Sequence, residues 1–187
     1  MSVRWITLVA SLLAACAQAA EPAATSAAPP AATPAAPAPK VPPFVANAPM
    51  GTGHCDPSEH AVFSCEVSGK RYLSLCTDPE FTQLQYRFGD PEKPDMRSPA
   101  TSAVSEFHYS HVAWAHGEEH NVWFVNEGHT YKVVSAVGGG GPTGDDGASN
   151  NYVGVRVIKD DKELAFVKCV KTPAADFLAN LDGVLAP

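Results

Sequence analysis

The segment that begins at His116, HGEEH, contains the residue types and the spacing of a metal site. On a helix, H-x-x-E-H would place two histidines and a glutamate on one face, and a further protein ligand would leave one position open for water. The flanking runs Val112–Trp114 and Val122–Phe124 favour strands, and Gly117 disfavours a helix. We therefore expect a hairpin tip and no catalytic metal. The candidate ligands for a metal are His116, Glu119 and His120.

Other catalytic chemistry is not indicated. The chain has no G-x-S-x-G elbow, no phosphate-binding glycine motif between a strand and a helix, and no S-x-x-K signature. We therefore expect neither an enzyme, nor catalytic residues, nor a cofactor. The density of histidines favours incidental zinc or nickel binding by histidine-rich hairpins, through His108, His111, His116 and His120.

The N-terminus predicts export. A charged start precedes the short apolar run Trp5–Ala15, which is typical of a signal peptide and too short to stay as a membrane span. The sequence LAAC, ending at Cys16, resembles the lipobox of bacterial lipoproteins, and this resemblance implies a signal peptide over 1–16 and a lipid on Cys16. Ala17 is similar to the outer-membrane sorting residue of that family. Cleavage by ordinary signal peptidase within 17–20 is the alternative, and it predicts a soluble periplasmic or secreted protein.

The cysteines after the N-terminal region are expected to form disulfides, as is usual in exported proteins. A two-residue turn at Ser68-Gly69 sets the cross-strand pairs Val67–Lys70, Cys65–Tyr72 and Ala61–Cys76. Cys65 and Cys76 are then ~13 Å apart along the hairpin, beyond the ~7 Å limit for a disulfide. Cys55 can reach Cys76 at the same end of the hairpin, which leaves Cys65 to pair with Cys169.

The rest of the chain predicts a mainly β domain over 47–187. Short runs rich in Val, Phe, Tyr and Trp alternate with turn residues, and they are HAVFSCEV, KRYLSLC, QLQYRFG, FHYSHVAWA, NVWFVN, HTYKVVSAV, NYVGVRVIK and ELAFVKC. We expect about eight strands, paired antiparallel in a small barrel or sandwich. One C-terminal helix is expected near 173–182, capped by Thr172 and ended by Gly183. The glycine-rich loop over 138–151 is expected to be mobile.

Composition suggests how the domain is held and what it binds. Residues 17–46 are rich in Ala and Pro and predict a disordered tether. The formal net charge of -7 argues against nucleic acid and favours a cationic partner. The membrane contact is expected to be the lipid anchor alone.

Two resemblances bear on function. The segment CDPSEHAVFSCEVSGKRYLSLC, followed by LQYRFG, resembles a family of uncharacterised exported proteobacterial proteins with the signature F-S-C, K-x-x-S-x-C and Y-R-F-G, although Arg71 stands at the lysine position here. That resemblance implies export and disulfides, and no activity. The element Ser68-Gly69-Lys70-Arg71-Tyr72 is similar to the S-G-x-x-Y element of periplasmic lysozyme inhibitors. It implies an inhibitory loop of Ser68, Gly69 and Tyr72, although a downstream Lys-Gly element is missing.

Together these patterns predict a non-enzymatic, membrane-tethered periplasmic binding or structural module, lipid-anchored at the outer membrane. Its expected partner is a protein or glycan of the cell envelope. Two alternatives remain open: inhibition of lysozyme, a cationic protein, and metal binding by the histidine-rich hairpins.

Overall fold

Each run expected to be a strand forms one in the computed structural model, which describes residues 41–99, 102–139 and 151–187. Cys16, the signal peptide, most of the tether and most of the glycine-rich loop lie outside the described residues. Within the described part, no helix has the length and apolar character needed to cross a membrane.

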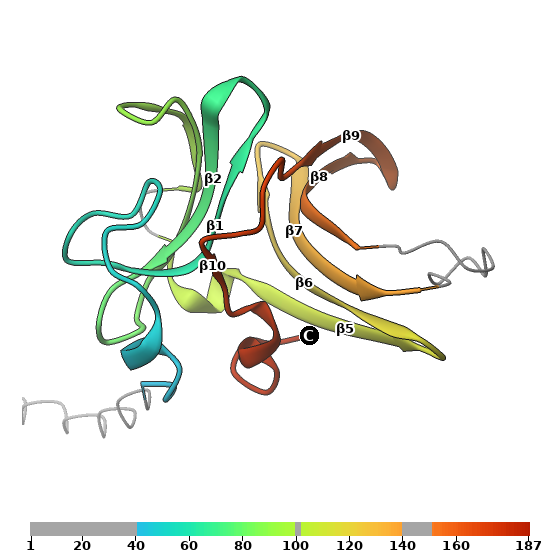
Figure 1. Ribbon diagram of the computed structural model, residues 1–187, viewed down its shortest axis with the longest axis horizontal. Coiled ribbons are helices and arrows are strands. Elements are labelled where there is room, and N and C mark those ends of the chain that lie inside the picture. The colour runs from blue at the N-terminus through green and yellow to red at the C-terminus, as the bar shows by residue number, and fades with distance from the viewer. Residues whose placement is uncertain (1–40, 100–101, 140–150) are drawn as a thin grey trace, which may run out of the picture. The chain divides into compact units, whose positions relative to one another are not determined.

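The strands form two antiparallel five-stranded sheets (Figure 1). The first sheet has the order β10 (Ala175–Asp176), β1 (His60–Val67), β2 (Arg71–Thr77), β3 (Leu84–Gly89) and β4 (Pro94–Arg97). The second has the order β5 (His108–Trp114), β6 (Gly117–Asn126), β7 (His129–Gly138), β8 (Tyr152–Lys159) and β9 (Lys162–Lys168). The sequence did not predict β4 and β10, because each is short and lacks a run of β-branched or aromatic residues.

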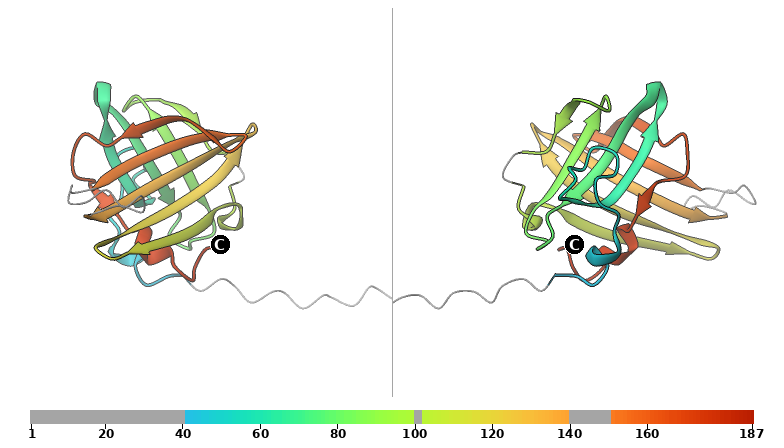
Figure 2. Two further views of the ribbon diagram at one scale, coloured as in Figure 1. Left: turned by 90° about the vertical axis from the view of Figure 1, so that its right-hand side faces the viewer. Right: turned by 60° about the vertical axis from the view of Figure 1, so that its left-hand side comes forward.

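The two sheets lie face to face with their strands crossing, so the fold is a β-sandwich, one of the two expected architectures (Figure 2). Alternate residues of each strand point into the interface, where they form the main hydrophobic core. At its centre the ring of Phe124 lies 5.2 Å from the rings of both Tyr86 and Phe107. Each sheet therefore has one face in the core and one outer face.

The outer face of the first sheet is covered by residues 53–59, which precede β1, whereas the earlier 3-10 helix η1 (Val45–Asn47) contributes Val45 to the main core. The disulfide Cys55–Cys76 ties this segment to β2, with the Cα atoms 5.3 Å apart. The Ser74 hydroxyl accepts a hydrogen bond of 3.1 Å from the His54 amide. The segment thus serves as a cover for this sheet.

The β1–β2 hairpin differs from the expected hairpin at its turn. It closes through η2 (Ser68–Lys70), which is one residue longer than expected because Gly69 and Lys70 both adopt positive φ, at 78° and 61°. The observed pairs are Val67–Arg71, Cys65–Leu73 and Ala61–Cys76. The first two differ from the expected pairs, so that part of the prediction was wrong. The third agrees, because a bulge at Val62 compensates for the extra turn residue.

The disulfides in the structure are Cys55–Cys76 and Cys65–Cys169, the pairing that the hairpin register predicted. The second joins β1 to the residue that follows β9, with Cα atoms 5.8 Å apart. It therefore links the two sheets covalently.

The C-terminal helix is shorter than expected and begins later. Thr172 does not cap it, because the chain first forms β10, in which Ala175 pairs with Ser64 of β1. Helical conformation is confined to the 3-10 helix η4 (Leu178–Leu181), whose two leucines are buried in the core. Strand pairing and leucine burial here outweigh the weak helix propensity of the segment. One further 3-10 helix, η3 (Val104–Glu106), precedes β5.

Candidate metal centre

The β5–β6 hairpin is the element that brings histidines together. Its turn consists of Ala115 and His116, and β6 starts directly after it. Gly117 is required there, since a Cβ atom on it would lie 2.4 Å from the carbonyl oxygen of Val137. The predicted hairpin tip is therefore present, although residues 117–120 of the HGEEH segment belong to strand β6. The H-x-x-E-H segment is not helical, so its two histidines do not share a helical face.

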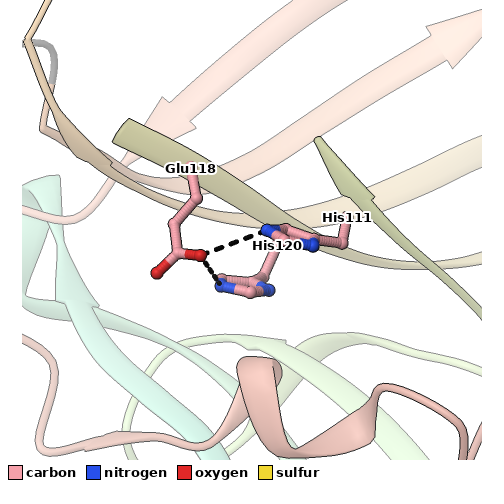
Figure 3. Close-up of side chains that lie close together, drawn as sticks. All are labelled: His111, Glu118 and His120. Carbon is pink, nitrogen blue, oxygen red and sulfur yellow. Dashed lines mark hydrogen bonds and ion pairs between the residues drawn. The ribbon is translucent and has the colours of Figure 1, made fainter. Parts of the chain in front are cut away.

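A different set of residues converges on the core-side face of this hairpin. His111 of β5 pairs directly with His120 of β6, and Glu118 lies two residues before His120 on the same face. Glu118 Oε2 lies 3.1 Å from His111 Nε2 and 3.5 Å from His120 Nε2. Figure 3 shows this oxygen between the two rings, which stack with centroids 4.6 Å apart. All three ligand atoms lie within 4.8 Å of one another.

A buried tyrosine, Tyr109, forms a hydrogen bond with one histidine of the cluster. The hydroxyl of Tyr109 lies 2.7 Å from Nδ1 of His120. When Nδ1 donates its proton to this hydroxyl, Nε2 is left as the free nitrogen on the side of Glu118. Burial raises the pKa of Tyr109, as do the carboxylates of Asp182 and Glu118, so the hydroxyl stays neutral. Its position resembles that of the hydrogen-bonding groups that orient histidine ligands in metal sites.

The two distances from Glu118 to the histidines suit ligands of one metal ion. Two ligands that each lie ~2.0–2.1 Å from a tetrahedral ion are ~3.3 Å apart, which is close to the observed separations from Glu118. The side chains of His111 and Glu118 are 35% and 47% exposed, and that of His120 is 13% exposed. Solvent can therefore reach the cluster, and further coordination positions can be filled by water. Without a metal, the same geometry is that of a histidine–glutamate ion pair.

The sequence named two of these three ligands, His111 and His120, among the histidines expected to bind metal incidentally, and it placed only His120 in the H-x-x-E-H set. His120 was a candidate, whereas His116 lies exposed in the turn and takes no part in the cluster. Glu119 points to the opposite face of the sheet, where it accepts hydrogen bonds from Tyr152 and Asn121. Glu118, and the grouping of His111 with His120, were missed because the proximity of these residues depends on the pairing of two strands. Aligning the hairpin about a turn at Ala115 and His116 would have found them.

The other predicted site is the turn of β1–β2. Ser68 and Gly69 are exposed, whereas Tyr72 is half-buried, with its ring centroid 6.1 Å from that of His54. Arg71 does not extend freely, because it forms an ion pair with Asp95 and stacks 4.3 Å above the ring of Phe88. The turn therefore exposes Ser68, Gly69 and Lys70 to solvent, and the next residue, Arg71, is held in place by its contacts with β3 and β4.

No known family or protein accounts for either site. The chain matches no protein-family model, and neither the curated proteins nor the solved structures include a significant match.

Proposed function

We propose that the chain is an exported, membrane-tethered binding module that captures a divalent transition-metal ion at His111, Glu118 and His120. The proposal depends on one observation, the convergence of two imidazole nitrogens and a carboxylate oxygen within 4.8 Å. Imidazole nitrogen suits Zn²⁺, Cu²⁺ and Ni²⁺, and a carboxylate adds the charge that holds a cation. The function proposed is binding and not catalysis, because the sequence has no recognisable catalytic motif.

A zinc titration tests this proposal. The full chain, purified without an affinity tag and stripped with a chelator, is expected to bind one zinc ion. His120→Ala and Glu118→Gln each remove a ligand and should abolish stoichiometric binding. Tyr109→Phe should weaken binding roughly 10-fold or more, because it removes the group that orients His120.

The matched control is His116→Ala, which removes a histidine of the H-x-x-E-H segment that lies outside the cluster. It should leave the affinity for zinc unchanged. Loss of zinc binding in this variant, or equal binding by His120→Ala and the unaltered chain, would contradict the proposed site.

A second candidate function is inhibition of lysozyme by the β1–β2 turn. The observation that favours it is that Ser68, Gly69 and Lys70 are exposed at the turn. The hairpin is tied to β4 directly beside them by the ion pair between Arg71 and Asp95. An inhibitory loop benefits from rigidity, because ordering a flexible loop costs affinity. Lys70 supplies a cation for the catalytic carboxylates of lysozyme, and the acidic charge of the chain would speed encounter with the basic enzyme.

Enzyme assays test this second candidate. The full chain should slow animal-type or invertebrate-type lysozyme at stoichiometric ratios, and Ser68→Ala should weaken this effect without lowering the melting temperature. Lys70→Ala should also weaken inhibition, and Lys93→Ala, on the exposed connection between β3 and β4, is its control for loss of a surface lysine. If neither lysozyme is slowed at low salt, where electrostatic steering is strongest, the inhibitor function is wrong.

A further inference from the structure

The outer face of the second sheet carries a transverse row of large side chains, which we call the ladder. Cross-strand pairing aligns its members in one line across the strands β5 to β9 (Figure 1). The ladder consists of His108, Trp123, Lys132, Arg156 and Phe166, each the direct cross-strand partner of the next. With neighbouring strands ~4.8 Å apart, it extends across the full width of the sheet, or ~19 Å.

The side chains contact one another at each end of the ladder, where cations lie against aromatic rings. The rings of His108 and Trp123 are stacked with centroids 5.4 Å apart, and the Lys132 ammonium lies 5.3 Å from the Trp123 ring. At the other end, the Arg156 guanidinium lies 5.1 Å from the ring of Phe166. Cation–π contacts of this kind hold the long side chains in place and so reduce the entropy lost on binding.

A glycine makes this packing possible. A Cβ atom on Gly154 would lie 3.0 Å from Cε2 of Phe166 and 2.2 Å from the carbonyl oxygen of Val167. Its absence leaves room for the rings of Phe166 and Tyr152, whose centroids are 5.9 Å apart beside Arg156. The glycine therefore allows two aromatic rings and the Arg156 guanidinium to pack together on this part of the sheet.

The ladder carries two cations, Lys132 and Arg156, in a chain that is acidic overall. Among the described residues, no carboxylate lies within ion-pair distance of Lys132 or of the neighbouring Lys168. Arg156 has carboxylates on both sides, with Glu163 at 3.3 Å and Glu119 at 3.8 Å. The surface thus offers cations for anionic groups and, next to them, carboxylates that accept hydrogen bonds from hydroxyl groups.

Two buried polar atoms on this face lack partners among the described residues. They are Oδ1 of Asn121 and Nε of Arg156. Asn121 is 2% exposed, and its amide nitrogen is already used in a 2.9 Å hydrogen bond to Glu119. Unpaired buried polar atoms are uncommon in folded proteins, and these two lie beneath the ladder, out of reach of a ligand on its surface.

We propose that the ladder binds an acidic polysaccharide, with sugar carboxylates on Lys132 and Arg156 and sugar hydroxyls on the flanking glutamates. This surface is separate from the metal centre, which lies on the opposite face of the same sheet. Nucleic acid fits less well, because its bases need open ring faces and the faces of Trp123 are covered by His108 and Lys132.

Calorimetry or NMR titration with oligogalacturonate tests the proposal on the full chain. A chelator is present throughout, so that the sugar carboxylates cannot bind through a metal ion. Oligogalacturonate should bind, and its methyl ester, which keeps the sugars and loses the charges, should bind about tenfold more weakly or worse. Lys132→Gln should weaken binding about tenfold, and Arg156→Lys should weaken it because the planar guanidinium is lost.

The controls separate this surface from the rest of the molecule. Lys162→Gln removes an exposed lysine of β9 that lies outside the ladder and should not change the affinity. His120→Ala should bind the oligosaccharide as the unaltered chain does, even if zinc binding is lost. Absence of binding at low salt, or equal weakening by Lys162→Gln and Lys132→Gln, would overturn the proposal. Tighter binding of single-stranded DNA or anionic lipid vesicles through Lys132 would overturn the choice of a polysaccharide.

Discussion

At the scale of single residues, the tetrapeptide YRFG, Tyr86 to Gly89, shows how a motif can serve the fold. The side chain of Arg87 is 4% exposed and donates hydrogen bonds of 2.6 and 2.7 Å to the two carboxylate oxygens of Glu59. A further bond of 2.6 Å reaches the carbonyl oxygen of His54. The arginine therefore holds the covering segment against β3, which is a structural role.

Removing the charge of Glu59 while Arg87 is kept should lower the free energy of unfolding. Glu59→Gln keeps the shape and removes the charge, so the buried Arg87 is left with Asp56 alone, a more distant and exposed carboxylate at 3.6 Å. We expect the free energy of unfolding in urea to fall by about 3 kcal/mol, near the lower end for buried pairs because Glu59 is partly exposed. Asp95→Asn, in the exposed pair with Arg71, is the control and should cost about 1 kcal/mol or less. Equal losses in the two variants would contradict the structural role of Arg87.

His54 should make stability depend on pH. Burial lowers its pKa below the ordinary value of 6.5, and Arg87 and Arg97 act in the same direction, whereas the hydrogen bond to Gly89 opposes them. The unfolded chain therefore binds a proton more readily than the folded chain. The stability due to neutral His54 is complete above pH 6.5 and is lost as the pH falls towards the lowered pKa.

Urea unfolding over a series of pH values checks this. His54→Gln can still donate to the carbonyl of Gly89 but does not titrate, so its stability should decline less steeply than that of the unaltered chain below pH 6.5. NMR titration of the His54 ring gives the pKa directly. A ring that titrates at or above 6.5 would refute the expectation.

At the scale of elements, the hairpins determine which side chains meet. The β5–β6 hairpin places His111, Glu118 and His120 on its core-side face, whereas Trp123 and Glu119 lie on its outer face. A shift of one residue in this pairing would exchange the two faces and remove both proposed sites. The Cys65–Cys169 disulfide likewise holds β1 beside the end of β9, 104 residues away in the sequence.

The disulfides should differ in their contribution to stability. Cys65 and Cys169 are 104 residues apart, and Cys55 and Cys76 are 21 apart. In the chain-entropy description the longer loop contributes about 1.4 kcal/mol more. The double variant Cys65→Ala/Cys169→Ala should therefore unfold at lower urea concentration than Cys55→Ala/Cys76→Ala. Peptide mapping that joins Cys65 to Cys76 would show that the strand pairing is wrong.

At the scale of the whole molecule, the sequence predicts an acidic β-domain at the end of an N-terminal tether. A tether of Ala and Pro would let an anchored domain search a volume around its attachment point. Capture of metal ions and binding of an acidic polysaccharide both suit a protein held in the cell envelope. The predicted lipid anchor is therefore the property to test for the cellular role.

Lipidation of Cys16 can be tested by fractionation. Cys16→Ala should abolish labelling with a fatty-acid probe and move the protein from the membrane fraction to the soluble fraction. Ala17→Asp is the control, because it should keep the lipid label and change only the membrane in which the protein is found. An unaltered chain that takes up no label would show that ordinary signal peptidase removes the leader.

The sequence by itself determined the positions of the long strands, because alternating β-branched and aromatic residues such as those of HTYKVVSAV are a local signal. It also predicted the cysteine pairs, since hairpin geometry limits which cysteines can meet. Only the tertiary structure decided that His111 and Glu118 join His120 while His116 does not, and that five residues from five strands form one ladder. These groupings depend on strand register, turn length and bulges, which are set by packing between segments distant in sequence.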